Sequence, residues 1–196
     1  MDQPVNLAGI RIITVSGRIA SGSTTLAKSL AKTLGWRHIE GGEVFWEAVR
    51  SKLGLDPKDT NKRPDAEDQD FDKSLKNILT NQSNIVLETK LAGFNAQGID
   101  GIFKILVVCN DIKGVDQTAI RIDRLVNREK IPIAKAKEEV LDREKNDLEK
   151  WRRLYASGDE NWLYWDEKNY DLLVNTFIYD PEESLKVALE EIGYKE

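Results

Sequence analysis

The sequence predicts an α/β protein with three layers, in which a five-stranded parallel sheet lies between two layers of helices. Two observations lead to this prediction. Short aliphatic runs alternate along the 196 residues with longer stretches of helical periodicity, and this alternation is typical of parallel sheets. A glycine-rich turn also joins the first aliphatic run to the first helical stretch, which is a common opening of doubly wound α/β domains.

The first aliphatic run, 10–15, is rich in β-branched residues and predicts a buried strand at the centre of the sheet. The stretch 24–34 follows, with leucines and alanines at helical spacing. Gly35 is suited to end this helix, because glycine adopts the left-handed C-cap conformation without strain.

The remaining strands are expected at four further runs: 36–40, 84–88, 104–109 and 171–175. Helices are expected in the amphipathic stretches between and after them: 43–53, 68–80, 115–129, 133–156 and 181–192. The segment from Leu53 to Asp70 is rich in Pro, Asp, Lys and Asn and is predicted to be a surface loop. The helix 133–156 carries only a thin apolar stripe, which is typical of a solvated helix or of a lid over a binding site.

Residues 17–25 form a phosphate-binding frame that lacks one residue. In the motif G-x-x-x-x-G-K-[ST], Gly17, Gly22 and Thr24 are in place, whereas Ser23 stands at the lysine position. The N–H groups of such a loop and the dipole of the following helix attract phosphate, so an ATP site is predicted. It comprises Gly17, Arg18, Ile19, Ala20, Ser21, Gly22, Ser23, Thr24 and Thr25. The Thr24 hydroxyl is placed to hold Mg²⁺. The alternative to a phosphate-binding loop is an ordinary glycine- and serine-rich turn before a helix.

Another cation could replace the missing lysine. Arg18 lies inside the loop and is the best candidate, although an exposed loop arginine without a ligand is equally consistent with the sequence. Lys28 lies four residues beyond Thr24, which is about 6 Å along the helix axis. Lys28 is therefore expected to face the sheet or solvent.

Composition excludes several classes of protein. The net charge of −5 argues against a general nucleic-acid binder. No apolar run approaches the roughly 18 residues of a membrane span. The single cysteine, Cys109, allows no internal disulfide, which fits a reducing compartment. We therefore expect one domain, 1–196, in the cytoplasm, acting as a monomer or weak dimer.

Five segments in order resemble the cytidylate kinases of the short archaeal type, within the P-loop nucleoside-monophosphate kinases. They are the strand and loop from Ile13, and the segments 40–45, 86–93, 121–129 and 170–176. The chain departs from the family pattern at three positions. Ser23 replaces the loop lysine, Trp46 replaces an arginine, and Lys90 replaces an arginine, with loss of its bidentate geometry.

The resemblance implies a kinase that transfers the γ-phosphoryl group of Mg²⁺-ATP to CMP or dCMP. It implies a monophosphate-binding helical segment at about 41–83 and a lid at about 128–156. Lys90 would hold the acceptor phosphate, and the remaining acceptor contacts would be Trp46, Asp72, Arg121 and Arg124. The catalytic cations would be Arg18, Arg128 and Arg143. For Arg121 and Arg124, structural salt bridges are an equal alternative.

Two other functions stay open. Ser23 and Trp46 favour a nucleotide-binding protein without useful turnover, acting as a sensor or partner. A kinase for another small acceptor is also compatible, since the loop indicates the donor and not the acceptor. Nucleic-acid binding is opposed by the acidic residues interleaved through 133–153.

Overall fold

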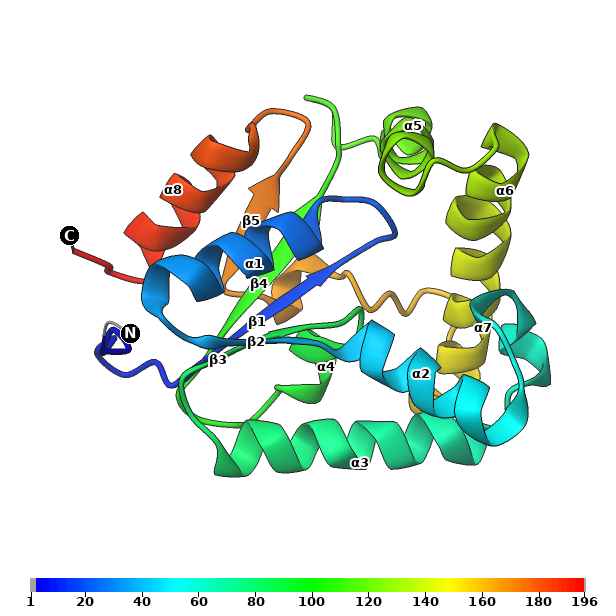
Figure 1. Ribbon diagram of the computed structural model, residues 1–196, viewed down its shortest axis with the longest axis horizontal. Coiled ribbons are helices and arrows are strands. Elements are labelled where there is room, and N and C mark those ends of the chain that lie inside the picture. Colours follow the sequence, from blue (N-terminus) through cyan, green and yellow to red (C-terminus); the bar gives the residue numbers. More distant parts are fainter. Residues whose placement is uncertain (1–2, 196) are drawn as a thin grey trace.

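The computed structural model describes residues 3–195, which fold around a five-stranded parallel sheet (Figure 1). The strands are β1 (Ile12–Gly17), β2 (Arg37–Glu40), β3 (Ile85–Glu88), β4 (Ile102–Val108) and β5 (Leu172–Asn175). Their order is β2-β3-β1-β4-β5, and all neighbouring pairs are parallel. The predicted parallel sheet, with its first strand at the centre, is confirmed.

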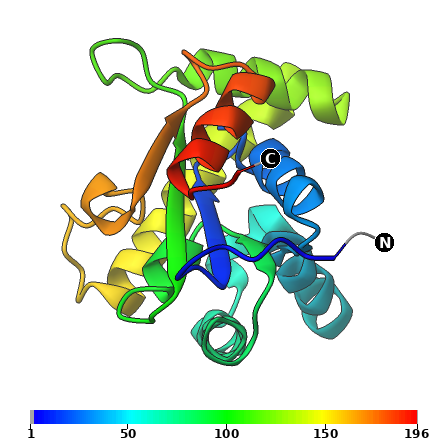
Figure 2. The same cartoon turned by 90° about the vertical axis from the view of Figure 1, so that its left-hand side faces the viewer.

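Helices lie on both faces of the sheet (Figures 1 and 2). The α-helices are α1 (Ser23–Leu34), α2 (Gly41–Leu53), α3 (Asp65–Asn81), α4 (Ala92–Asn95), α5 (Thr118–Glu129), α6 (Ile133–Lys137), α7 (Glu144–Tyr155) and α8 (Pro181–Glu191). Shorter segments are the 3-10 turns η1 (Pro57–Lys62) and η3 (Glu167–Asn169), and the π-helical turn η2 (Glu138–Arg143).

The central strand is buried on both sides, as expected for a strand covered by helices on each face. Ile13 and Val15 pack in a core with α1 and α8, whereas Ile12 packs in a second core with α3 and α4. The carboxyl ends of β1 and β3 therefore open at one edge of a rigid sheet, which is where ligands bind in this architecture. Among the described residues, no helix is both long and apolar enough to cross a membrane.

The segment 53–70 differs from its prediction as a surface loop. It contains η1 and the first turn of α3, and Thr60 and Arg63 are buried in it. The reason is electrostatic, because these polar side chains bond to carboxylates of Asp68 and of Asp147 on α7. Polar side chains of this segment are therefore buried by pairing with carboxylates, although the segment has no periodic pattern of apolar residues.

The predicted helix 133–156 is found as α6, η2 and α7 in direct succession, which form one column in Figure 1. The π-helical turn in the middle was not predicted. Such turns occur often at functional sites. Here η2 ends at Arg143, which lines the cleft described below, and α7 begins with Glu144, which bonds to Arg18 of the loop.

Candidate active site

The phosphate loop runs from the end of β1 into α1 and requires its glycines. A Cβ on Gly17 would lie 2.9 Å from the carbonyl oxygen of Val107 and closer still to Ser21 Oγ. Gly22 has φ of 108°, which disfavours other residues. No side chain in the described chain caps α1, so its first N–H groups remain available to an anion.

Two arginines of α5 hold this loop from outside. Arg121 Nη1 donates to the carbonyl of Ile19 at 2.8 Å, and Arg124 Nη1 donates to that of Ser21 at 3.3 Å. Thr176, just after β5, donates to the Ser21 carbonyl as well, at 2.6 Å. Arg121 is fully buried. These contacts, with the ion pairs of Arg121 to Asp116 and Glu144, weigh against the predicted acceptor contacts of Arg121 and Arg124 and favour the structural alternative.

Arg18 does not act as a free cation in the loop. Its Nε donates to Glu144 Oε1 at 2.9 Å, its Nη1 lies 3.3 Å from Asp116 Oδ1, and its guanidinium stacks 4.6 Å from the ring centroid of Trp165. Glu144 also accepts from the Ile19 N–H at 3.2 Å. These contacts hold Arg18 against α7, which weighs against its predicted role as the replacement for the lysine.

Glu88, at the end of β3, was not predicted as a site residue. Its Oε1 accepts from Ser23 Oγ at 3.0 Å and from Thr24 Oγ1 at 2.9 Å. Its Oε2 is buried without a hydrogen-bond partner among the described residues, with His38 Nε2 at 3.9 Å. Burial raises the pKa of Glu88, and the two hydroxyls oppose this. The signal available in the sequence was its position at the carboxyl end of a parallel strand.

The donor set around Thr24 suits Mg²⁺. This ion prefers oxygen ligands and is commonly held by one or two carboxylates together with substrate phosphates. The Thr24 hydroxyl and the unpartnered oxygen of Glu88 are oxygen atoms of the kind that could hold the ion beside the loop. A bound cation would also stabilise the ionised form of a carboxylate whose pKa burial has raised.

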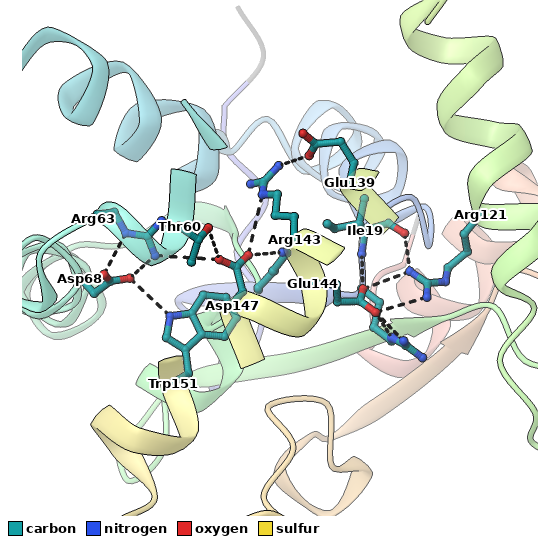
Figure 3. Close-up of polar contacts among 12 residues, drawn as sticks. Ile19, Thr60, Arg63, Asp68, Arg121, Glu139, Arg143, Glu144, Asp147 and Trp151 are labelled. Carbon is teal, nitrogen blue, oxygen red and sulfur yellow. Dashed lines mark hydrogen bonds and ion pairs between the residues drawn. The ribbon is translucent and has the colours of Figure 1, made fainter. Parts of the chain in front are cut away.

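Asp147 of α7 lies where several donors converge (Figure 3). Lys90 Nζ is 2.7 Å from Asp147 Oδ2, and Thr60 Oγ1 is 2.9 Å from Oδ1. Arg143 and Arg63 lie farther away, at 3.8 and 3.9 Å. Burial alone would raise the pKa of Asp147, but the charges of Lys90 and Arg143 outweigh it and lower that pKa. Lys90, the predicted acceptor contact, is thus engaged by an internal carboxylate.

Two other predicted acceptor residues also have partners. Trp46 is buried, with the guanidinium of Arg63 4.8 Å from its ring centroid. Asp72 accepts hydrogen bonds from Tyr155 Oη and from Asn95 Nδ2. The Asp72 carboxylate is therefore oriented by a buried amide and a half-buried hydroxyl, and Trp46 presents little free surface for stacking on a base.

These elements surround a cleft of about 510 Å³. Most of the predicted residues line it: Gly17, Arg18, Ile19, Ala20, Gly22, Ser23, Thr24, Thr25, Trp46, Asp72, Lys90, Arg128 and Arg143. Ser21, Arg121 and Arg124 do not. A second cavity, of about 770 Å³, lies on the other side of the loop between α5 and the turn after β5; Arg124 and Tyr179 are among its lining residues.

Comparisons with known proteins agree with this geometry. A family model described as an AAA domain matches residues 16–152. A cytidylate kinase of Haloarcula marismortui is 33% identical over 184 residues, which cover 92% of this chain and 88% of that protein. A cytidylate kinase of Natronomonas pharaonis is 32% identical, covering 87% and 83%. The chain belongs to the cytidylate kinase family.

The fold is shared more widely than this family. A shikimate kinase from Acinetobacter baumannii, solved in complex with shikimate, superposes with a TM-score of 0.56 at 15% identity, covering 94% of each chain. At that identity the likeness concerns the fold alone. This chain and the structural neighbour thus share the three-layer P-loop architecture described above.

Proposed function

We propose that this protein is a nucleoside-monophosphate kinase that transfers the γ-phosphoryl group of ATP to CMP or dCMP. One observation carries the proposal. The phosphate loop and the cations Lys90 and Arg143 line the same cleft, so a donor phosphate and an acceptor phosphate can meet there. Membership of the cytidylate kinase family supports the choice of acceptor.

The donor nucleotide would use the loop and the second cavity. The N–H groups at the start of α1 bind phosphate, while Arg121 and Arg124 hold the loop carbonyls on the opposite side. Thr24 and Glu88 would hold Mg²⁺, which when bound to ATP neutralises phosphate oxygens during transfer. The nucleoside part of ATP would enter the cavity between α5 and the turn after β5.

The acceptor phosphate would be held by Lys90, which must first leave Asp147. Arg143, with its Nη1 2.6 Å from Glu139, and Arg128, which is exposed and paired with Glu129, would neutralise the transferring group. The acceptor is already largely ionised at neutral pH, because the second pKa of a phosphate monoester is about 6. The protein therefore needs to position phosphates rather than remove a proton.

The test is to incubate the purified protein with Mg²⁺-ATP and each of CMP, dCMP, UMP, AMP and GMP. ADP and the nucleoside diphosphate should form in equal amounts with CMP or dCMP. ATP consumption with shikimate or a sugar acid, and none with any monophosphate, would instead indicate a kinase for another small acceptor.

A second function is favoured by two observations. Ser23 stands where the family has a lysine that binds the ATP phosphates, so that positive charge is missing. Lys90, the proposed contact of the acceptor phosphate, is already paired with Asp147. Both are compatible with a protein that binds ATP without turnover, as a sensor or partner. ATP binding together with the absence of any diphosphate product would support this alternative.

A further inference from the structure

The cations around the phosphate loop differ in how firmly they are held. Arg18 is bound by Glu144 and Asp116, and Lys90 is bound by the buried Asp147. Arg124 is bound to the carbonyls of Ser21 and Thr176. Each of these would have to break contacts with buried or half-buried partners before it could reach a phosphate at Ser23.

Lys28 differs from these three side chains. Its side chain is 59% exposed, and its ion pair, 3.1 Å from Nζ to Glu40 Oε2, is with a partly exposed carboxylate. Exposed pairs of this kind are weak and exchange readily. Lys28 and Glu40 both line the cleft, together with Ser23, Thr24 and Glu88. Lys28 is therefore exposed to solvent, as the sequence predicts, and it also lies at the cleft.

The geometry of α1 brings Lys28 toward the loop. Residues four apart lie on one face of a helix, so Lys28 lies beneath Thr24. Helical side chains lean toward the N-terminus, and the four-carbon stem of a lysine recovers much of the roughly 6 Å rise between the two residues. The charge of Lys28 also acts on the buried Glu88 carboxylate that holds Ser23 and Thr24, and it lowers the pKa of that group against the effect of burial.

We propose that Lys28 supplies the phosphate-binding cation that Ser23 lacks. On binding of ATP its ammonium leaves Glu40 and donates to a phosphate oxygen at the start of α1. This inference rests on the proposed use of the loop for ATP. The missing positive charge would thus come from Lys28, one turn into α1, and not from Arg18 in the loop.

The test measures the dissociation constant of Mg²⁺-ATP by calorimetry for four proteins. Lys28→Met should weaken binding about tenfold or more, as loss of a charge-assisted hydrogen bond does. The control is Lys32→Met, one turn farther along α1, exposed and outside the cleft, which should bind like the wild type. The double variant Ser23→Lys, Lys28→Met should return to within about threefold of the wild type, because it restores a cation at the family position.

Three outcomes separate the inference from the proposed function. If Lys28→Met binds ATP as the wild type does, Lys28 is not the replacement, while the kinase proposal stands. If the double variant is not rescued, the effect of Lys28→Met is structural and the inference is wrong. If the wild type itself binds no Mg²⁺-ATP, the proposed function fails together with the inference.

Discussion

At the scale of single residues, Glu88 links the missing lysine to the proposed metal site. Both Ser23 and Thr24 donate to one oxygen of its buried carboxylate, and the other oxygen has no hydrogen-bond partner among the described residues. A lysine at position 23 would place a positive charge next to Glu88. In its absence, the charge of Lys28 lowers the pKa of Glu88, and a Mg²⁺ ion bound there would further stabilise the ionised carboxylate.

This arrangement predicts a pH dependence. Glu88 must be ionised to hold Mg²⁺, and burial raises its pKa above the ordinary glutamate value of about 4.3. Metal-dependent ATP binding should therefore weaken as the pH falls, and the weakening should begin at a higher pH than for an exposed glutamate. Glu88→Gln should bind Mg²⁺-ATP more weakly at neutral pH and should lack this decline. The measurement is ATP affinity against pH at fixed Mg²⁺.

The control for this experiment is Glu43→Gln, an exposed carboxylate that lines the same cleft. It should show the wild-type profile. The ionisation of ATP itself is common to all three proteins and cancels in the comparison. Equal profiles for the wild type and Glu88→Gln would remove Glu88 from the metal site.

At the scale of elements, α5 supports the phosphate loop from behind. Arg124 contributes hydrogen bonds to the Ser21 and Thr176 carbonyls and contacts the Thr176 hydroxyl. Arg124→Met should therefore lower kcat/KM for ATP by about tenfold, since each lost charge-assisted bond is worth about 1.5–3 kcal/mol. The KM for CMP should not change. A raised KM for CMP with normal ATP kinetics would restore the original prediction of an acceptor contact.

The packing of α7 against η1, α3 and the residues after β3 is the second feature at this scale. Asp147 joins α7 to Lys90 and Thr60, and Lys150 of α7 lies 2.8 Å from Asp68 of α3. Asp147→Asn leaves Lys90 buried without its counter-charge, so the free energy of unfolding should fall by about 3–5 kcal/mol. The measurement is urea denaturation, with the exposed neighbour Asp142→Asn as a control that should stay within about 0.5 kcal/mol of the wild type.

The same variant makes a prediction about pH. The pKa of Asp147 is lowered in the fold, so its contribution to stability is present above the unfolded pKa and is lost as pH falls through the folded value. The difference in stability between the wild type and Asp147→Asn should therefore be largest near neutral pH and shrink in acid. A difference that is independent of pH would show that Asp147 is not a stabilising charge.

At the scale of the whole molecule, the sheet was predictable because its signals are local. Strands β1, β3, β4 and β5 are short runs rich in aliphatic residues, and the glycines of the loop mark where β1 turns into α1. The site was predictable only in part. The burial of Arg121, and of Thr60 against Asp147, depends on partners 23 and 87 residues away in the chain, and such pairings leave no periodic pattern in the sequence.

The central claim is that one cleft holds both phosphates, with Lys90 on the acceptor side. Its test is the KM for CMP of Lys90→Met in the background of Asp147→Asn, compared with Asp147→Asn alone, so that removal of Lys90 does not leave the Asp147 carboxylate buried without its counter-charge. The account predicts a KM for CMP raised about tenfold or more, with the dissociation constant of Mg²⁺-ATP unchanged. An unchanged KM, or a wild type that binds ATP but forms neither CDP nor dCDP, would contradict it.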